Sequence, residues 1–372
     1  MASFNLFDGS TAPRTLVGGE FGFIGQLGAL STSGVAITAS GAVDVTVQGA
    51  LQATGNALLL NGDSLNLFVG QQGVIGSTTS DTVRAAFTGS IYVSNDGALH
   101  SGSDALDIRA SDTGGVINIL NAGTISGASD GIVTNSGDGA TRIVNTGSIL
   151  GVDSGIDHLG GAALFINRGE VSGSQYGYSG ADGVDTVQNS GSIFGGVFGE
   201  AGADVVLNSG TIDRVDLGAG DDRYDGRRGF VDTEVLGGLG KDDLRGGDGY
   251  DPLYGGAGAD VLRGRGGDDL LEGGSGADVL YGGPGDDLLR GGTAADTFRF
   301  GTNHGADTIS DLSSVDKIDL TALDLVSFSA DVRGAIRAVK GGSVIDLSDD
   351  FGLTISLDGV RVAELTASDF VI

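Results

Sequence analysis

A nine-residue repeat over residues 237–299 constrains the fold of this chain more than any other feature. Seven consecutive units keep one register: GGLGKDDLR, GGDGYDPLY, GGAGADVLR, GRGGDDLLE, GGSGADVLY, GGPGDDLLR and GGTAADTFR. Glycine recurs at positions one, two and four, and only Arg265 and Ala294 break that rule. Every unit has aspartate at position six and an apolar residue at position eight. A flexible glycine-rich linker would not keep these fixed offsets, so the pattern predicts a folded repeat.

The period itself indicates how the repeat folds and what it binds. Glycines allow positive φ values in tight turns and bring backbone carbonyl oxygens close to a ligand. A short strand follows each turn with its position-eight side chain inward, so two units complete one coil and stacked coils bury an apolar ladder. The position-six carboxylates then stack roughly 4.8 Å apart and repel unless a cation neutralises them. Calcium suits such flexible, oxygen-only sites better than magnesium.

These units resemble the glycine-rich RTX calcium-binding repeat, whose consensus G-G-x-G-x-D-x-U-x is typical of a parallel β-roll. The resemblance implies several Ca²⁺ ions and a segment that is disordered without them and folded with them. It places Asp242, Asp260, Asp278 and Asp296 on one edge of the roll and Asp251, Asp269 and Asp287 on the other. An outlying unit at 217–225, LGAGDDRYD, adds Asp222. The position-four glycines complete the predicted metal site: Gly240, Gly249, Gly258, Gly267, Gly276 and Gly285.

A second, looser repeat precedes the roll. Its clearest copies are INILNAGTISG, RIVNTGSILG, LFINRGEVSG, TVQNSGSIFG and VVLNSGTID, and they align on Asn121, Asn145, Asn167, Asn189 and Asn208. A period near 22 residues with inward Ile, Val and Leu matches one coil of a parallel β-helix. Stacked asparagines can hydrogen-bond from coil to coil. The copies resemble the N-x-G-x-I-x-G solenoid repeats of large secreted surface proteins and adhesins, which implies an architecture more than an activity.

The fold expected from these patterns is all-β, with an N-terminal parallel β-helix continuing into a calcium-binding β-roll and a β-rich C-terminal cap. The predicted boundaries are an aromatic-rich N-terminal cap at 1–33, the β-helix at 34–216, the roll at 217–300 and the C-terminal region at 301–372. That last region resembles the C-terminal flank of RTX proteins exported by type I secretion systems. Its final residues, DFVI, resemble the terminal signature of many such substrates.

Composition and charge narrow the range of partners. Acidic residues outnumber basic ones 49 to 20, and the net charge of −29 argues against nucleic-acid binding. The chain has no cysteine, no apolar run long enough to span a membrane and no conventional signal peptide at its start. We therefore expect a secreted protein that leaves the cell by a route other than an N-terminal signal.

No motif of a known enzyme class is convincing. His100, His158 and His304 are far apart in the sequence and none belongs to H-E-x-x-H. The G-x-S-x-G match at 127–131 lacks a strand-to-helix elbow and a triad, so it is better explained by chance. The variable turns carry a candidate carboxylate cluster of Asp112, Asp130, Asp153 and Asp157. It is explained equally well by a solvated acidic face, by weak calcium contacts or by catalysis. We predict no catalytic residue.

The sequence thus predicts a secreted, calcium-binding structural or adhesive protein that folds on meeting extracellular calcium. The expected partners are calcium, the type I secretion machinery, and either further copies of the chain in a surface layer or matrix or a surface polysaccharide. The alternative is a carbohydrate-active enzyme of the polysaccharide lyase or epimerase type, built on the β-helix and carrying an RTX module.

Overall fold

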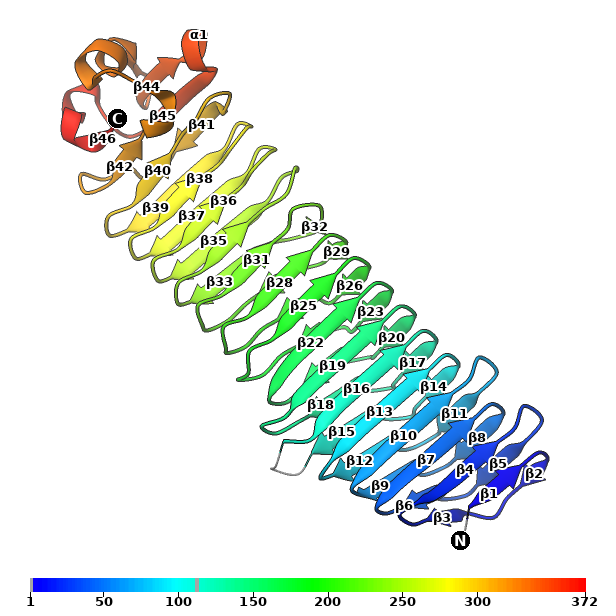
Figure 1. The fold of residues 1–372 in the computed structure, drawn as a ribbon. Coiled ribbons are helices and arrows are strands. Elements are labelled where there is room, and N and C mark those ends of the chain that lie inside the picture. The colour runs from blue at the N-terminus through cyan, green and yellow to red at the C-terminus, as the bar shows by residue number, and fades with distance from the viewer. Residues whose placement is uncertain (1–2, 111–113) are drawn as a thin grey trace. The chain divides into compact units, whose positions relative to one another are not determined.

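The computed structural model describes residues 3–110 and 114–372, and Figure 1 shows the order of the elements along the chain. The described residues form two compact units, one within residues 3–110, 114–202 and 210–213 and the other of residues 203–209 and 214–372. Each unit is built mainly of short parallel strands wound into a β-solenoid, which confirms the predicted all-β class.

The first unit has three parallel sheets, and each coil contributes one strand to each sheet. The first sheet contains β1 (Phe4–Leu6), β4 (Glu20–Ile24), β7 (Ala42–Val47), β10 (Ser64–Val69), β13 (Ser90–Asn95), β16 (Val116–Asn121), β19 (Ala140–Asn145), β22 (Ala162–Asn167) and β25 (Thr186–Asn189). The second contains β2 (Gly9–Ser10), β5 (Ala29–Thr32), β8 (Ala50–Ala53), β11 (Val74–Ser77), β14 (Ala98–His100), β17 (Thr124–Ser126), β20 (Ser148–Leu150), β23 (Glu170–Ser172), β26 (Ser192–Phe194) and β29 (Thr211–Ile212). The third contains β3 (Arg14–Leu16), β6 (Ile37–Ala39), β9 (Leu58–Gly62), β12 (Val83–Phe87), β15 (Leu106–Ala110), β18 (Ile132–Asn135), β21 (Ser154–His158), β24 (Tyr176–Ser179) and β27 (Val197–Phe198).

Stacked apolar side chains fill the interior of this unit. In the first sheet the register places Ile119 beside Ile143 and Ile143 beside Phe165, and all three side chains are buried. Ile125 and Ile149 are paired in the same way in the second sheet. Each coil covers the apolar surface of its neighbour, so these ladders supply the hydrophobic stabilisation of the unit.

An asparagine ladder runs beside the apolar core. The side-chain amide of Asn121 donates to Oδ1 of Asn145 at 2.8 Å, and that of Asn145 donates to Oδ1 of Asn167 at 2.9 Å. Asn95 and Asn189 extend the ladder at its two ends. Because an amide carries both donors and an acceptor, each buried asparagine satisfies its neighbour without any other ligand. The predicted coil-to-coil hydrogen bonding is therefore confirmed within the first unit.

The N-terminal residues already form a coil of the same kind. Strands β1, β2 and β3 pair in parallel with β4, β5 and β6. Phe4 is buried against this coil, whereas the Phe7 side chain is 66% exposed. Whether residues 1–33 act as a cap stays a prediction.

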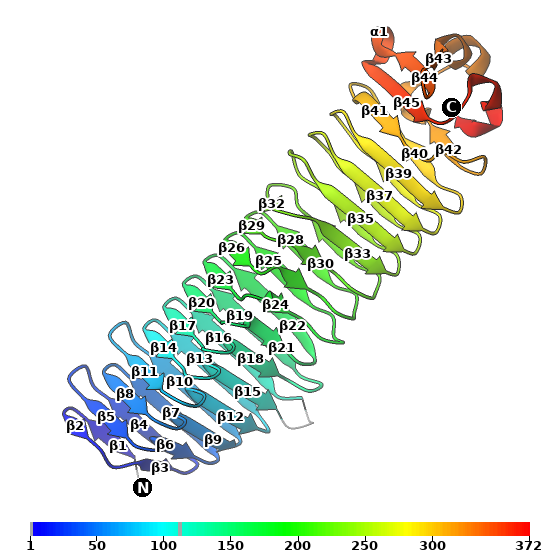
Figure 2. The ribbon, with the colours of Figure 1, turned by 180° about the vertical axis from the view of Figure 1, so that it is seen from behind.

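The second unit contains the β-roll, in which alternate nonapeptides lie in alternate sheets. One sheet contains β28 (Val205–Asn208), β31 (Arg223–Asp225), β34 (Asp243–Arg245), β36 (Val261–Arg263), β38 (Val279–Tyr281), β40 (Thr297–Arg299) and β42 (Lys317–Asp319). The other sheet contains β30 (Val215–Asp216), β33 (Val235–Leu239), β35 (Pro252–Ala257), β37 (Leu270–Ser275), β39 (Leu288–Thr293) and β41 (Gly305–Ile309). Its strands are labelled in Figure 2, which shows the ribbon turned by 180° from the view of Figure 1. A short strand, β32 (Phe230–Val231), lies on the turn between β31 and β33.

Position-eight side chains form the interior of the roll. Leu244, Leu262 and Leu280 are stacked in one sheet, and Leu253 and Leu271 in the other. All five side chains have no exposed surface. The register offset of eighteen residues confirms that two nonapeptides complete one coil.

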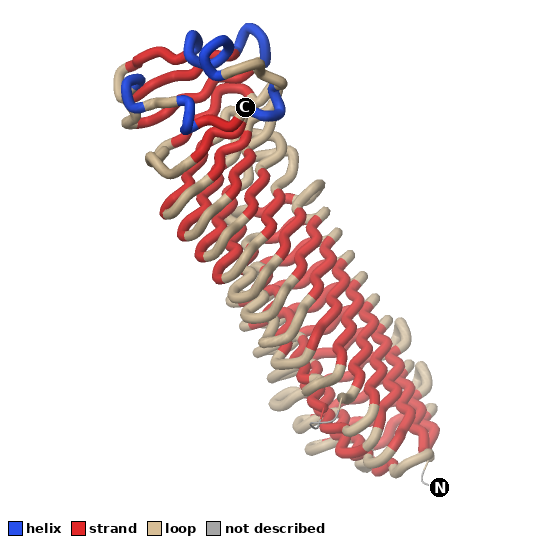
Figure 3. Tube along the Cα trace, turned by 60° about the vertical axis from the view of Figure 1, so that its left-hand side comes forward, coloured by secondary structure: helices blue, strands red, loops and turns tan. Residues whose placement is uncertain are grey.

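A mixed cap ends the second unit. Its strands are β43 (Ile336–Val339), β44 (Gly342–Leu347), β45 (Leu353–Asp358) and β46 (Phe370–Val371), and its helical turns, coloured in Figure 3, are η1 (Thr321–Leu323), η2 (Phe328–Val332), η3 (Arg333–Ala335), α1 (Ser348–Phe351), η4 (Val362–Glu364) and η5 (Ala367–Asp369). Strands β45 and β46 pair in parallel with β41 and β42, and β44 runs antiparallel to both β43 and β45. None of the helices in the described part of the chain is long and apolar enough to cross a membrane.

Candidate metal centre

The position-six aspartates form two columns, one on each edge of the roll. In the first column the backbone N–H of Asp242 donates to Oδ1 of Asp260 at 2.9 Å, and that of Asp260 donates to Oδ1 of Asp278 at 2.8 Å. The same bond joins Asp278 to Asp296, and Asp222 joins the column through Asp242. One oxygen of each carboxylate is therefore held by the backbone of the neighbouring turn.

The second column has the same bonds. The N–H of Asp251 donates to Oδ1 of Asp269 at 2.9 Å, and the N–H of Asp269 donates to Oδ1 of Asp287 at 2.8 Å. The seven aspartates of the nonapeptide run thus lie in the two columns that the repeat predicts.

The other carboxylate oxygen of most of these aspartates has no hydrogen-bond partner and is therefore available to a proton or a cation. A buried Oδ2 atom with no hydrogen-bond partner is found in Asp222, Asp242, Asp260, Asp269, Asp278, Asp287 and Asp296. Leaving a carboxylate oxygen buried and unpaired is costly, so the metal-free protein favours the protonated group. Burial raises the pKa to about 6 in Asp222, Asp242, Asp260, Asp278, Asp287 and Asp296. Burial, reinforced by the neighbouring carboxylates of its column, raises the pKa of Asp269 to about 8.

The position-one glycines show what faces these oxygens. A Cβ atom on Gly237 would lie 2.4 Å from Oδ2 of Asp242 and 2.6 Å from the carbonyl oxygen of Gly255. A Cβ on Gly255 would meet Asp260 Oδ2 and the next position-one carbonyl in the same way, at 2.5 and 2.6 Å. The unpaired oxygen and a backbone carbonyl oxygen thus approach the same side of each glycine, in space that only glycine leaves open.

This donor set fits calcium. Among the residues that the structure describes, no group of three or more Asp, Glu, His or Cys side chains lies close enough to hold a metal by itself. A cation here would need backbone carbonyl oxygens in addition to the aspartates. Calcium takes six to eight oxygen ligands of these two kinds in flexible geometry, whereas structural zinc sites are built mainly from cysteine sulfur and histidine nitrogen.

The position-four glycines shape the turns. The φ value is 124° at Gly240, 151° at Gly258, 106° at Gly267, 129° at Gly276 and 147° at Gly285. The N–H of Gly240 donates to the carbonyl of Ala257 at 2.8 Å, and that of Gly258 donates to Ser275 at 2.7 Å. These bonds join each turn to the next one in its column. A direct role of the position-four carbonyls in binding metal stays a prediction.

The turn at Gly249 and Asp251 differs from the others. Gly247 donates its N–H to Oδ2 of Asp251 at 2.7 Å, so this oxygen already has a partner. Arg265, which breaks the glycine rule, has a φ value of 85° and donates to the carbonyl of Gly246 at 2.8 Å. Burial raises the pKa of Asp251, and the positive charge of Arg265 counteracts that rise. An arginine thus supplies positive charge at the first turn of the second column.

Both columns extend beyond the nonapeptides that the sequence pattern identified. Asp287 donates its N–H to Oδ1 of Asp307 at 3.0 Å, and Asp296 donates to Asp316 at 2.9 Å. At the other end, Asp204 donates to Asp222 at 2.6 Å. Degenerate units contain Asp204 and Asp307, namely GEAGADVVL at 199–207 and TNHGADTIS at 302–310. Their position-six aspartate and position-eight apolar residue are the signal that could have revealed them.

The first unit contains one turn of the same type. In GADGVDTVQ at 180–188, a Cβ on Gly180 would lie 2.5 Å from Oδ2 of Asp185 and 2.6 Å from the carbonyl oxygen of Gly199. Here, however, the hydroxyl of Tyr178 donates to Oδ2 of Asp185 at 2.7 Å. A protein hydroxyl thus satisfies the oxygen that has no partner in most turns of the roll.

The other candidate residues form no comparable centre. Ser129 of the G-x-S-x-G match donates to Asp130, while His100, His158 and His304 hydrogen-bond to Ser126, Thr134 and Tyr281 respectively. Asp112 lies outside the described residues. Burial, followed by the charges of Asp130 and Asp104, raises the pKa of Asp157 to about 6. Asp104 is thus a member of this acidic group that the sequence did not identify.

Comparison with known proteins agrees with the geometry of the roll. Residues 236–271 and 263–298 match the family model of the RTX calcium-binding nonapeptide repeat. A solved structure, a subunit of the mannuronan C5-epimerase from Azotobacter vinelandii, is 32% identical over 36% of this chain and 78% of that one. Its TM-score is 0.22, so the likeness carries no argument about the fold or activity of this chain. No curated protein matches the chain.

Replacing Asp260 with asparagine separates metal binding from packing. The substitution removes a buried charge but keeps the shape, so we expect unchanged or higher stability in chelator. In calcium, the substitution should raise the calcium concentration at which half of the protein is folded about tenfold, which corresponds to ~1.4 kcal/mol. Far-UV circular dichroism across a calcium titration measures both effects. Glu272→Gln, which makes the same charge change on the outer face of the roll, is the control, and equal midpoints for the two variants would refute the assignment.

Stability without calcium should depend on pH in the direction set by the raised pKa values. A carboxyl whose folded pKa lies above its unfolded value stabilises the fold below about pH 4 and loses that contribution as the pH rises. In chelator, the free energy of unfolding of the roll should therefore fall between pH 4 and pH 8, through the folded pKa values of about 6 and about 8. Saturating calcium should reverse this trend, because it binds the ionised carboxylates. Urea unfolding at several pH values tests the prediction, which a flat profile in chelator would contradict.

Proposed function

We propose that this chain, an RTX-repeat protein over residues 236–298, is a secreted protein whose second unit folds when it meets extracellular calcium. The observation that carries the proposal is the row of buried, unpaired Oδ2 atoms on the two edges of the roll. In a cytosol low in free calcium these carboxylates favour the unfolded chain, which a narrow export channel requires. Outside the cell, calcium supplies the missing charge.

The magnitudes support a switch made of many weak sites. Extracellular calcium modules bind with dissociation constants of about 10⁻⁴ to 10⁻³ M, so millimolar calcium stabilises each site by about 0.5–1.5 kcal/mol. A single site would change little. The turns of each column are hydrogen-bonded to one another, so several sites act on one cooperative segment.

The first unit supports a structural or adhesive role outside the cell. Its asparagine ladder and the bond from Tyr178 to Asp185 satisfy buried polar groups without a cation. We therefore expect this unit to be folded in the absence of calcium and to serve as a stable scaffold. Self-association into a layer or matrix stays a prediction. The carbohydrate-active alternative also stays open, and an assay for new reducing ends or unsaturated uronates tests it.

Limited proteolysis should reveal the difference between the two units. With chelator, trypsin should cut the roll at Arg245 and Arg263 while residues 3–110 resist digestion. Millimolar calcium should protect the roll by roughly tenfold or more in rate, because cleavage follows the population of the open form. Mass spectrometry of the fragments identifies the protected region. Equal protection of the roll in chelator and in calcium would contradict calcium-coupled folding.

Export by a type I system depends on the C-terminal region in this proposal. Deleting residues 354–372 should trap the protein inside cells that contain such an exporter, whereas deleting residues 1–33 should leave export intact. Cell fractionation measures the location of each variant. Because Phe370 is buried and pairs with Ile318, the deletion should also weaken the folded cap, so location and folding must be measured separately. Export that survives the C-terminal deletion and fails without residues 1–33 would reverse the assignment.

A further inference from the structure

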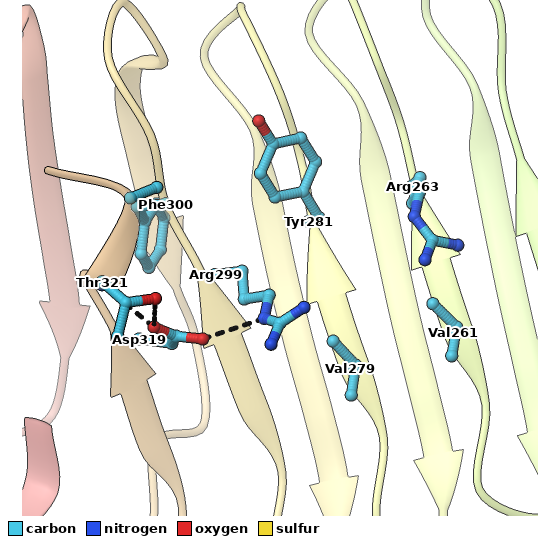
Figure 4. Close-up of a pocket in the computed structure, with 9 residues that line it drawn as sticks. Val261, Arg263, Val279, Tyr281, Arg299, Phe300, Asp319 and Thr321 are labelled. Atoms are coloured by element: carbon cyan, nitrogen blue, oxygen red, sulfur yellow. Dashed lines mark hydrogen bonds and ion pairs between the residues drawn. The ribbon is translucent and has the colours of Figure 1, made fainter. Parts of the chain in front are cut away.

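A groove of about 370 Å³ lies on the outer face of the roll. Its floor is made by outward-facing residues of β36, β38 and β40, and its end by residues at the start of η1. Figure 4 shows Arg263, Tyr281 and Arg299 along this face, beside Val261 and Val279. The groove therefore combines an apolar floor with two guanidinium groups, a phenol and the carboxylate of Asp319.

The groove is an exception in a strongly acidic protein. The chain carries 49 acidic and 20 basic residues, yet the outward positions of β36, β38 and β40 contain two arginines and no carboxylate. The strand register places Arg263 beside Tyr281, and Arg299 is the equivalent residue of the next strand of the sheet. The two guanidinium groups are thus spaced along one face, and each is paired with a carboxylate, that of Asp243 or Asp319.

Both arginines are oriented but still have donors to offer. Nη1 of Arg263 pairs with Asp243 at 2.6 Å, and Nε of Arg299 pairs with Asp319 at 2.9 Å. Each of these bonds uses one nitrogen of a guanidinium, which has five N–H donors in all. The Arg299 side chain remains 56% exposed. An anionic group in the groove could therefore bind to guanidinium groups whose orientation is already fixed.

His304 contacts the Tyr281 side chain by a hydrogen bond and by ring packing. Gly301 donates its N–H to Nε2 of His304 at 3.1 Å, and the same nitrogen is hydrogen-bonded to the Tyr281 hydroxyl at 3.0 Å. The two rings also meet edge to face, with centroids 4.8 Å apart. Burial lowers the pKa of His304 to about 4, so the ring stays neutral near pH 7. Tyr281 is thereby fixed as an amphipathic platform.

We propose that this groove binds an acidic polysaccharide, with carboxylate or sulfate groups on Arg263 and Arg299 and a sugar ring against Tyr281. An extended acidic peptide suits the groove less well, because peptides commonly add a strand to a free sheet edge. Here β36, β38 and β40 are each paired on both sides. Recognition must therefore come from side chains alone.

The proposal rests on the proposed function, because the groove exists only when the roll is folded. Calcium in the aspartate columns would also reduce the repulsion between a polyanion and a protein of charge −29. At physiological salt, charges farther away than about 8 Å are largely screened, so Arg263 and Arg299, together with their partners Asp243 and Asp319, determine the local potential.

Fluorescence polarisation with labelled short probes tests the proposal on the full chain, in millimolar calcium and in chelator. The probes are oligogalacturonate for carboxylates, dextran sulfate for sulfates, neutral dextran and poly-L-glutamate. We expect binding of one or both acidic polysaccharides in calcium and none of neutral dextran. The double variant Arg263→Gln/Arg299→Gln should weaken binding about tenfold or more. Arg290→Gln is the matched control, since Arg290 is also 56% exposed but lies on the other sheet.

The outcomes separate the two proposals. If circular dichroism shows that calcium folds the roll but no acidic polysaccharide binds, the groove inference is wrong and the proposed function stands. Equal losses in the Arg290 control, or tighter binding of poly-L-glutamate, would also overturn the inference. Binding that is the same in chelator and in calcium would contradict calcium-coupled folding and leave the groove assignment intact.

Discussion

Everything in the second unit depends on one electrostatic constraint: a carboxylate oxygen that is buried and faces a backbone carbonyl oxygen. Two acceptors cannot satisfy each other, so this arrangement needs a proton or a cation between them. The fold creates the arrangement repeatedly, as at Asp242, Asp260 and Asp278, because each turn is stacked on an identical one. Ionised carboxylates at these positions therefore destabilise the metal-free roll, and a proton or a bound cation would remove that cost.

The first unit meets the same demand with different chemistry. Asparagine offers both donor and acceptor, so Asn121 and Asn145 satisfy each other when they stack. Aspartate offers acceptors only, and the aspartate columns lie at another point of the coil: Asp204 precedes β28 and Asn208 ends it. The side chain at each stacked position therefore decides whether a neighbouring coil can satisfy its buried oxygen or whether a proton or a cation is needed.

The sequence predicted most of this because a strict period determines register. Once Asp242 and Leu244 recur every nine residues, the two-column arrangement and the leucine interior follow from strand geometry. The degenerate turns were harder to foresee. Asp307 stands in a unit with no glycine at positions one and two, so the aspartate and Ile309 mark the unit in the sequence, and the hydrogen bond from Asp287 places it in the column. The donation from Tyr178 to Asp185 was also hidden, because its partners come from different elements of the coil.

The ends of the columns explain why these irregular residues occur where they do. The last turn of a column has a neighbouring turn on one side only, so fewer oxygen atoms would be available there to hold a cation. Asp251 is satisfied by Gly247 and the charge of Arg265, and Oδ2 of Asp316 accepts the N–H of Ser313 at 2.7 Å. At Asp307, burial and then the charge of Asp287 raise the pKa, as burial does for Asp269 in the interior of the same column. Protein donors thus replace part of what a neighbouring turn would supply at Asp251 and Asp316.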